Sequence, residues 1–289
     1  PAGVRHQFGM LSAFSVEHCP PSWWNTVRHQ RGIVSAIAWN TQVDESGLDV
    51  ERAVQAAPEA RLVHVTPAHQ APTGAVLALP RRQHLLDWAS ATGAWVFEDD
   101  YDSEYRYAGR PIPALHGLDV HGQVLHVASF GKTMFPGLRL GYLVLPTRLV
   151  ERFAAARANV DRFPSVLHQA AMAGFLSDGH YARHLRRMRL LYASRYEALR
   201  ESLHQHASDL IELPAVPAGL ETVVWLPDGL DDSAAANRLA EKGIRVEPIS
   251  KSRVHRAGRP GLVLGFAAWD PSAMDKAVKV MSGLLRAML

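Results

Sequence analysis

The fold of this chain is decided by one stretch of its sequence, Ser129-Phe130-Gly131-Lys132-Thr133-Met134-Phe135-Pro136-Gly137-Leu138-Arg139-Leu140-Gly141-Tyr142. An apolar run at residues 124–128 comes directly before it and predicts a buried strand. That strand leads into a turn that carries Lys132, and Arg139 follows seven positions later. We therefore expect an amine and a guanidinium just beyond the carboxyl end of one strand.

Two earlier strands end in polar loops of the same kind. Residues 61–66 predict a buried strand that leads into a proline-bounded loop with Gln70. Residues 94–97 predict another, and the acidic run Glu98-Asp99-Asp100 follows it. Helical spacing between the strands, as at residues 80–92, indicates right-handed crossovers and a mostly parallel sheet. Because ligands of such sheets bind outside the carboxyl ends of the strands, we expect these loops to meet at one edge.

The sequence becomes strongly helical after residue 146. The predicted helices cover residues 148–160, 165–176 and 181–205. Beyond them the pattern predicts a smaller α+β unit, with strands at residues 222–226, 244–246 and 262–266 and a helix at 274–289. We therefore predict an α/β chain with a large domain at residues 1–176 and a small C-terminal domain at residues 177–289.

Composition and charge describe an ordinary globular protein. The 289 residues can bury a sizeable core, and 47% hydrophobic against 20% charged residues is typical of that class. A net charge of +3 is too small to indicate a nucleic-acid partner. No apolar run approaches the ~18 residues of a membrane span. The one cysteine, Cys19, excludes an internal disulfide and a cysteine metal cluster, so we expect a reducing cytoplasm.

Lys132 and Arg139 together indicate a cofactor that carries both an aldehyde and a phosphate. A lone lysine in a turn is most often a solvated charge. A lysine amine that is desolvated beside a cationic centre can instead attack an aldehyde. The guanidinium of Arg139 can donate two hydrogen bonds to one phosphate, and Ser129 supplies a hydroxyl nearby. This set predicts pyridoxal 5'-phosphate, held as a Schiff base on Lys132.

The acidic run after residue 97 supplies the candidate partner of the cofactor ring. A metal site would need converging oxygen or histidine ligands, and none is evident at useful spacing. An ionised Asp99 beside a pyridine nitrogen would keep that nitrogen protonated, and Tyr101 could donate to the ring oxygen. Gln70 could reach the ring edge. We expect surface or structural ion pairs at Asp102, Glu104 and Arg106.

Four motifs of the chain form one specific set: His69-Gln70-Ala71-Pro72-Thr73-Gly74, Glu98-Asp99-Asp100-Tyr101-Asp102-Ser103-Glu104-Tyr105, residues 129–142, and the arginine-rich run Gly179-His180-Tyr181-Ala182-Arg183-His184-Leu185-Arg186-Arg187-Met188-Arg189. From about residue 32 to the end, the chain resembles the aminotransferase-like domain of MocR-type regulators. These belong to the GntR family, in which a winged helix-turn-helix that binds DNA is joined to a fold-type I aminotransferase domain that binds pyridoxal phosphate. Taken alone, the arginine-rich run is better explained by an amphipathic helix with solvent-facing arginines than by a DNA-binding patch.

The resemblance implies a role for each candidate residue. Lys132 is then the Schiff-base lysine, Asp99 pairs with the ring nitrogen, Tyr101 pairs with the ring oxygen, and Arg139 binds the phosphate. A homodimer is also implied, because a second subunit usually completes fold-type I sites. DNA binding would come only through the winged helix. We expect this chain to lack both that winged helix and the beginning of the large domain.

The chain also departs from the family pattern at several positions. Gly131 stands where a serine usually precedes the lysine, and Glu221 stands where we expect a histidine. The arginine that clamps a substrate carboxylate in aminotransferases has no counterpart in the strand at residues 262–266. The candidates to replace it are Arg245, Arg253, Arg256 and Arg259.

Three functions follow from these observations. The first is the effector domain of a MocR-type regulator, which senses an amino compound or the cofactor through a Schiff base at Lys132. The second is a free-standing aminotransferase of class I/II, in which the freed Lys132 is the general base. The third is a degenerate fragment with weak cofactor binding. The His-Gln loop and the arginine-rich run favour the first, and the missing carboxylate arginine argues against efficient transamination.

Overall fold

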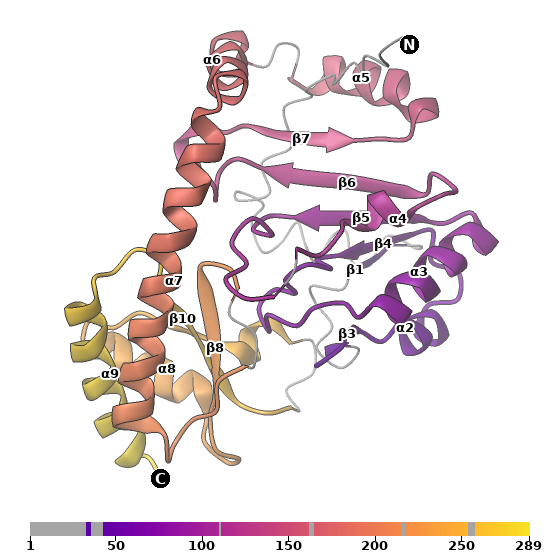
Figure 1. Cartoon of the computed structure of the whole chain (residues 1–289). Coiled ribbons are helices and arrows are strands. Elements are labelled where there is room, and N and C mark those ends of the chain that lie inside the picture. Colours follow the sequence, from indigo (N-terminus) through magenta and orange to yellow (C-terminus); the bar gives the residue numbers. More distant parts are fainter. Residues whose placement is uncertain (1–32, 36–42, 110, 162–164, 215–217, 254–257) are drawn as a thin grey trace.

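Five strands form the main sheet of the computed structural model, which describes residues 33–35, 43–109, 111–161, 165–214, 218–253 and 258–289. Their order in the sheet is β1 (Ile33–Ser35), β4 (Leu62–Val65), β5 (Trp95–Asp100), β6 (Val124–Ser129) and β7 (Gly141–Val144). The first four run parallel, and β7 runs antiparallel to β6 (Figure 1). The mostly parallel sheet expected from the sequence is therefore confirmed, and β4, β5 and β6 end at one edge.

Two helices pack on one face of this sheet. They are α2 (Val50–Ala56) and α3 (Leu79–Thr92), and the short ribbon of β2 (Val43–Asp44) and β3 (Gly47–Leu48) precedes α2. Pro80 stands in the first turn of α3, and Gly93 ends the helix in the left-handed conformation at φ 68°. The apolar side chains of the helices meet those of the strands in a core that includes Leu48, Val50, Val63, Val65, Leu85, Leu86, Ala89, Val96 and Val124.

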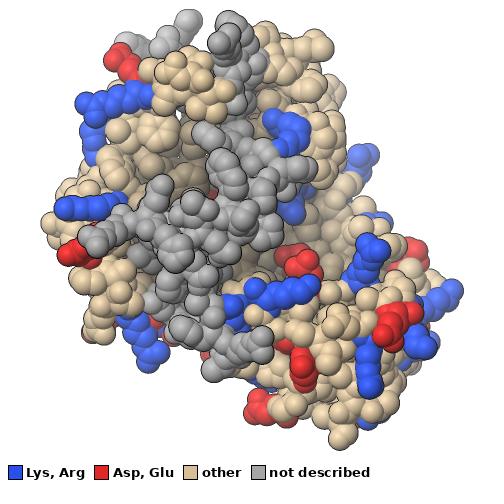
Figure 2. Space-filling view, turned by 180° about the vertical axis from the view of Figure 1, so that it is seen from behind, with Lys and Arg blue, Asp and Glu red and all other residues tan. Residues whose placement is uncertain are grey.

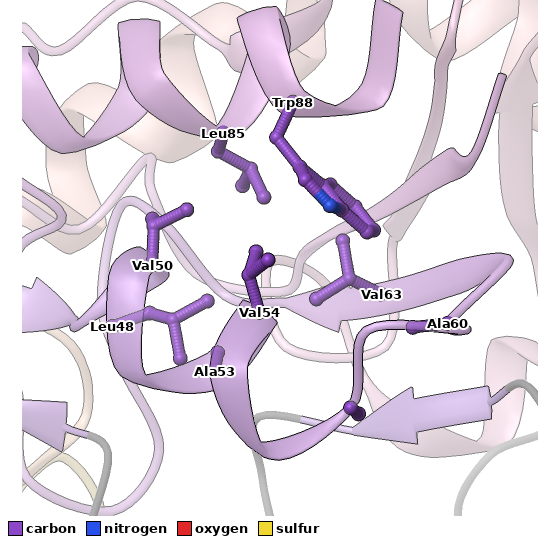
Figure 3. A pocket seen from close by; sticks show the side chains of 9 residues that line it. Leu48, Val50, Ala53, Val54, Ala60, Val63, Leu85 and Trp88 are labelled. Carbon is purple, nitrogen blue, oxygen red and sulfur yellow. The ribbon is translucent and has the colours of Figure 1, made fainter. Parts of the chain in front are cut away.

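An apolar pocket lies between these two helices and β4. Figure 3 shows Leu85 and Trp88 of α3 across from Val54 of α2 and Val63 of β4. The remaining lining residues are Leu48, Val50, Ala53, Ala57 and Ala60. Every lining side chain is hydrophobic, whereas sites for polar ligands need convergent hydrogen-bonding groups. This pocket is a packing gap within the core, and the candidate site lies elsewhere.

A series of helices follows the antiparallel strand β7. They are α5 (Thr147–Asp161), α6 (Val166–Ser177) and the long helix α7 (His180–Ala207). In Figure 1, α7 runs from the β7 side of the main sheet down to the C-terminal part of the molecule. The three helices expected from the sequence are thus present, with ends shifted by one or two residues.

The C-terminal part is built on a small antiparallel sheet. Its order is β8 (Glu221–Trp225), β10 (Gly261–Gly265) and β9 (Glu247–Pro248), and the helices around it are α8 (Asp232–Glu241), the short η4 (Ile249–Ser252) and α9 (Pro271–Arg286). The strand expected at residues 244–246 was wrong, because those residues are irregular and the pairing with β10 begins at Glu247. The middle and C-terminal turns of α7 bury Tyr196, Leu199 and Leu203 in the core of this part, against residues of α9 such as Val278 and Met281.

One face of the molecule and the character of its helices can be described from the structure. Figure 2 shows lysine and arginine side chains interspersed with acidic ones on the face seen from behind, in keeping with the net charge of +3. Among the residues that the structure describes, no helix is both long and apolar enough to cross a bilayer.

Candidate functional site

Asp99 and Ser129 share one face of the sheet at its carboxyl edge. In the parallel pairing of β5 with β6, Asp99 lies opposite Val127, and Ser129 is two residues further along β6. Neighbouring strands are about 4.8 Å apart, and alternate side chains point to opposite faces. The carboxylate and the hydroxyl expected to serve the cofactor are therefore neighbours on the same face.

His64 of β4 orients the carboxylate of Asp99. Its register partner is Phe97, two residues before Asp99, so the imidazole stands on the same face of the sheet. Nε2 of His64 lies 3.3 Å from Oδ2 of Asp99, and the two side chains are 11% and 18% exposed. This partner of Asp99 was not predicted from the sequence. The one indication of it was a histidine within the otherwise apolar run of β4.

Glu98 belongs to the opposite face and has a structural role. It is 1% exposed, and its carboxylate accepts hydrogen bonds from the backbone N–H groups of Leu115 and His116, at 2.6 and 3.0 Å. These N–H groups begin the short helix α4 (Leu115–Leu118), and Nδ1 of His126 lies 3.0 Å from the carboxylate. Burial opposes ionisation of Glu98, but His126 and the two backbone donors outweigh it and lower the pKa of this carboxyl.

The turn after β6 presents Lys132 with an exposed side chain. The hydroxyl of Ser129 accepts the N–H of Gly131 at 3.0 Å, and the carbonyl of Phe130 accepts the N–H of Met134 at 2.8 Å. These bonds close the backbone around the lysine. Thr133, the next residue in the chain, is 1% exposed, so the backbone is anchored at the position that follows Lys132.

Arg139 has an unusual backbone conformation for a residue with a side chain. It follows the short turn η3 (Pro136–Leu138) and adopts φ 52° in the left-handed region. Such conformations disfavour residues with a Cβ and gather at functional sites. The structure thus keeps a strained arginine two residues before the first residue of β7, Gly141, which pairs with Ser129.

A buried cluster lies where the loops after β4 and β5 meet. Nδ1 of His69 is 2.8 Å from Oδ2 of Asp102, and both residues are buried. The hydroxyl of Tyr101 donates to the carbonyl of His69 at 2.9 Å. Asp102, expected to form a surface or structural ion pair, therefore forms a buried pair with His69. Arg106, expected in the same class, has its Nε and Nη1 buried without a hydrogen-bond partner in the described part of the chain.

Gln70 is buried within its own loop. Its side-chain nitrogen donates to the carbonyl of Ala71 at 3.3 Å. Its backbone N–H donates to Ala75, and its carbonyl accepts from Gly74. These bonds make Gln70 part of the loop's frame, and its contact with a cofactor ring stays a prediction.

The charges of this cluster act on one another. Burial, followed by the charges of Asp102 and Glu221, raises the pKa of Tyr101 well above its ordinary value, so the phenol is a hydrogen-bond donor at neutral pH. Desolvation by neighbouring protein atoms raises the pKa of Glu221, although part of the residue remains exposed to solvent. The charges of Lys132 and His69 oppose this shift. Glu221, at the start of β8, therefore lies within electrostatic reach of the lysine.

The arginines considered for a substrate carboxylate have other positions. Arg259 forms an ion pair with Glu212 at 2.6 Å and lies over the ring of Trp225. Arg253 donates to the carbonyl of Arg259. Arg245 is exposed, and Arg256 lies outside the described residues. Among the described residues, no group of three histidine, cysteine or acidic side chains is arranged to hold a metal ion.

Gly219, which lies shortly before β8, packs closely against the buried pair of His69 and Asp102. Its φ is 73°, and a Cβ there would lie 2.3 Å from Cε1 of His69 and 2.7 Å from Oδ2 of Asp102. We expect Gly219→Ala to lower the free energy of unfolding by about 3 kcal/mol, from the collision and the left-handed backbone together. Gly243→Ala, at φ 78° with no atom within 4 Å, should lower it by only about 1 kcal/mol. Chemical denaturation measures both, and equal losses would contradict the collision.

Comparison with known proteins places this geometry in a family. Residues 24–281 match the family described as aminotransferase class I and II. This chain belongs to that family. Its structure also superposes on a kynurenine aminotransferase of Pyrococcus horikoshii, solved in complex with PMP, with a TM-score of 0.80 and 24% identity over 89% of this chain and 69% of that one. The chain therefore has the fold-type I aminotransferase fold.

Curated sequences similar to this aminotransferase-family chain include transcriptional regulators. One is the probable rhizopine catabolism regulatory protein MocR of Rhizobium meliloti, 36% identical over 246 residues, which are 85% of this chain and 50% of that protein. Another is the pyridoxine biosynthesis regulator PdxR of Corynebacterium glutamicum, 33% identical over 231 residues, 80% of this chain and 49% of that one. The chain thus spans about half the length of these curated relatives and is homologous to their aminotransferase-like part.

Proposed function

We propose that this chain is the pyridoxal-phosphate-binding, aminotransferase-like domain of a MocR-type regulator of the GntR family. In this proposal Lys132 binds the cofactor as a Schiff base, and the bound cofactor senses an amino compound. The observation that carries the proposal is that Asp99 and Ser129 lie on the same face of the sheet, near the carboxyl ends of β5 and β6. The turn with Lys132 directly follows β6. Homology to regulators at 36% and 33% identity supports the regulatory role.

The donor set of this edge fits pyridoxal phosphate. The cofactor needs an amine for its aldehyde, an anion for its ring nitrogen, a donor for its ring oxygen and cations or hydroxyls for its phosphate. Lys132, Asp99 and Tyr101 supply the first three, and Arg139 with Ser129 supplies the last. The buried phenol of Tyr101 stays protonated, as this role requires.

Each of these site residues has a distinct role in this proposal. When bound, the cofactor supplies an electron sink for an amino compound. Asp99, oriented by His64, holds a negative charge beside the ring nitrogen. The hydroxyl proton of Tyr101, which is donated to the carbonyl of His69 in this structure, would turn to the ring oxygen when the cofactor binds. Arg139 and Ser129 would retain the phosphate. The freed amine of Lys132 can hold a proton near the substrate, where Glu221 tunes the local charge.

The wider assembly is part of the same proposal. We place a large cofactor-binding domain at residues 1–176 and a small domain at residues 177–289. The domain works as a homodimer in the cytoplasm, and DNA is bound by a winged helix of the regulator that is distinct from this domain. A free-standing aminotransferase is the second candidate, favoured by the fold shared with solved aminotransferases.

Spectroscopy with pyridoxal phosphate tests the proposal. We expect the purified chain to develop a visible absorption band that saturates with added cofactor. When amino acids and other amines are then added one at a time, the effector should shift this band, and no keto acid should accumulate. Steady keto-acid release with conversion to the pyridoxamine form would indicate an aminotransferase. If no band develops at any cofactor concentration, the proposed cofactor binding is contradicted, and the third function, a degenerate fragment, is the one that remains.

A further inference from the structure

The first turns of α7 contact the turn that carries Lys132. The hydroxyl of Tyr181 donates to Oγ1 of Thr133 at 3.0 Å, and Nε2 of His184 donates to the carbonyl of Thr133 at 2.9 Å. Residues three apart on a helix lie on one face, so both side chains reach the same target. Thr133 directly follows Lys132 in the chain. The arginine-rich run of the sequence therefore contains two inward-facing side chains, and neither of them contacts the cofactor in the proposed function.

Thr133 is also held by a residue of another segment, the loop after β5. The hydroxyl of Tyr105 donates to the same carbonyl at 3.2 Å. The ring of Tyr181 meets the ring of Phe130 edge to face, with centroids 5.7 Å apart and an interplanar angle of 86°. Phe130 and Thr133 flank the dipeptide Gly131-Lys132, so the side chains fix both ends of the lysine turn. Burial raises the pKa of Tyr181, which keeps its hydroxyl a donor.

The remainder of α7 belongs to the C-terminal part of the molecule. Tyr196, Leu199 and Leu203 are buried in the core built around the small sheet and α9. The helix is continuous over residues 180–207, a length of about 42 Å at 1.5 Å per residue. One rigid element therefore joins the small-sheet core at one end to the lysine turn at the other (Figure 1).

We propose that Tyr181 and His184 are positioning residues that hold Lys132 through Thr133 and make the lysine's orientation follow the position of the small-sheet core. This rests on the proposed function of Lys132. Two donors fix the backbone carbonyl beside the lysine, and one fixes the neighbouring hydroxyl. A displacement of α7, as when a ligand draws the two parts together, would move these anchors and the amine with them.

Hydrogen exchange of the cofactor-free chain tests the anchoring by itself. We expect amides of residues 130–140 to exchange about tenfold faster in the double variant Tyr181→Phe/His184→Leu, because two hydrogen bonds to the turn are lost. Arg187→Gln, an exposed position on the same helix, should exchange like the unaltered chain. Tyr181→Phe keeps the ring, and protection of residues 190–207 reports whether α7 remains folded. Unchanged exchange at residues 130–140 with α7 intact would overturn the inference.

Cofactor affinity tests the consequence for the lysine. We expect the double variant to bind pyridoxal phosphate about tenfold more weakly, because the amine is no longer preorganised. In the Tyr181→Phe background, His184→Gln retains a donor for the carbonyl of Thr133 and should bind the cofactor more tightly than His184→Leu, recovering part of this loss. Equal affinity of all variants would overturn the coupling. If the unaltered chain binds no cofactor, the proposed function fails, and the exchange result alone still decides whether the turn is anchored.

Discussion

Replacing Lys132 by alanine is expected to abolish the visible absorption band that pyridoxal phosphate develops with the unaltered chain. The band requires a covalent link between the cofactor and an amine, and alanine supplies none. Asp99, Tyr101 and Arg139 remain in the variant, so weak non-covalent binding should persist without the band. Absorption spectroscopy and equilibrium dialysis separate the two effects.

Lys242→Ala is the matched control for this substitution. Lys242 is exposed at the end of α8, and its removal should leave the band intact. A band of normal intensity in Lys132→Ala would contradict the assignment of the lysine. Loss of the band in Lys242→Ala would contradict it equally.

The second large effect is expected at Glu98. Glu98→Gln should lower the free energy of unfolding by about 3–5 kcal/mol, because it breaks a buried charge pair with His126 and turns an amide toward backbone N–H donors. Glu59→Gln removes an exposed carboxylate and should change stability by less than about 0.5 kcal/mol. Chemical denaturation near pH 6 compares them. A loss at Glu98 no larger than at Glu59 would show that the pair does not stabilise the fold.

The same pair predicts a pH dependence. Burial opposes ionisation of Glu98, but its hydrogen bonds outweigh burial and lower the pKa of this carboxyl from 4.5. The stability that ionised Glu98 contributes is therefore present above about pH 4.5 and is lost as the pH falls through the lowered pKa. Burial alone would lower the pKa of His126, but Glu98 raises it above 6.5. The stability that protonated His126 contributes is therefore present below about pH 6.5 and is lost as the pH rises through the raised pKa. The pair should therefore stabilise most between about pH 4.5 and 6.5. In Glu98→Gln this dependence should disappear.

The carboxyl edge of the sheet could be predicted because it depends on local patterns. Apolar runs that end in polar loops predicted β4, β5 and β6, and parallel pairing brings such loops together. The antiparallel turn-back of β7 carries no comparable pattern. The strand expected at residues 244–246 failed because a short apolar pair does not reveal which residues find a partner strand.

The acidic run shows why the rest of the site could not be predicted. Period-two alternation says that Glu98 and Asp99 face opposite sides of β5, but only the tertiary structure says which side is the core. His64 and Asp102 became visible as partners only through the pairing of β4 with β5 and the meeting of their loops. The inward side of α7 was hidden in the same way, because arginines dominate the composition of that segment and mask Tyr181 and His184.

Covalent trapping is the measurement that tests the central claim most directly. The chain has five lysines, Lys132, Lys242, Lys251, Lys276 and Lys279, so peptide mass spectrometry can resolve them all. Reduction of the cofactor-loaded chain with borohydride should leave a phosphopyridoxyl group on the peptide that contains Lys132 and on no other. A label on one of the other four lysines, with Lys132 unmodified, would contradict the account.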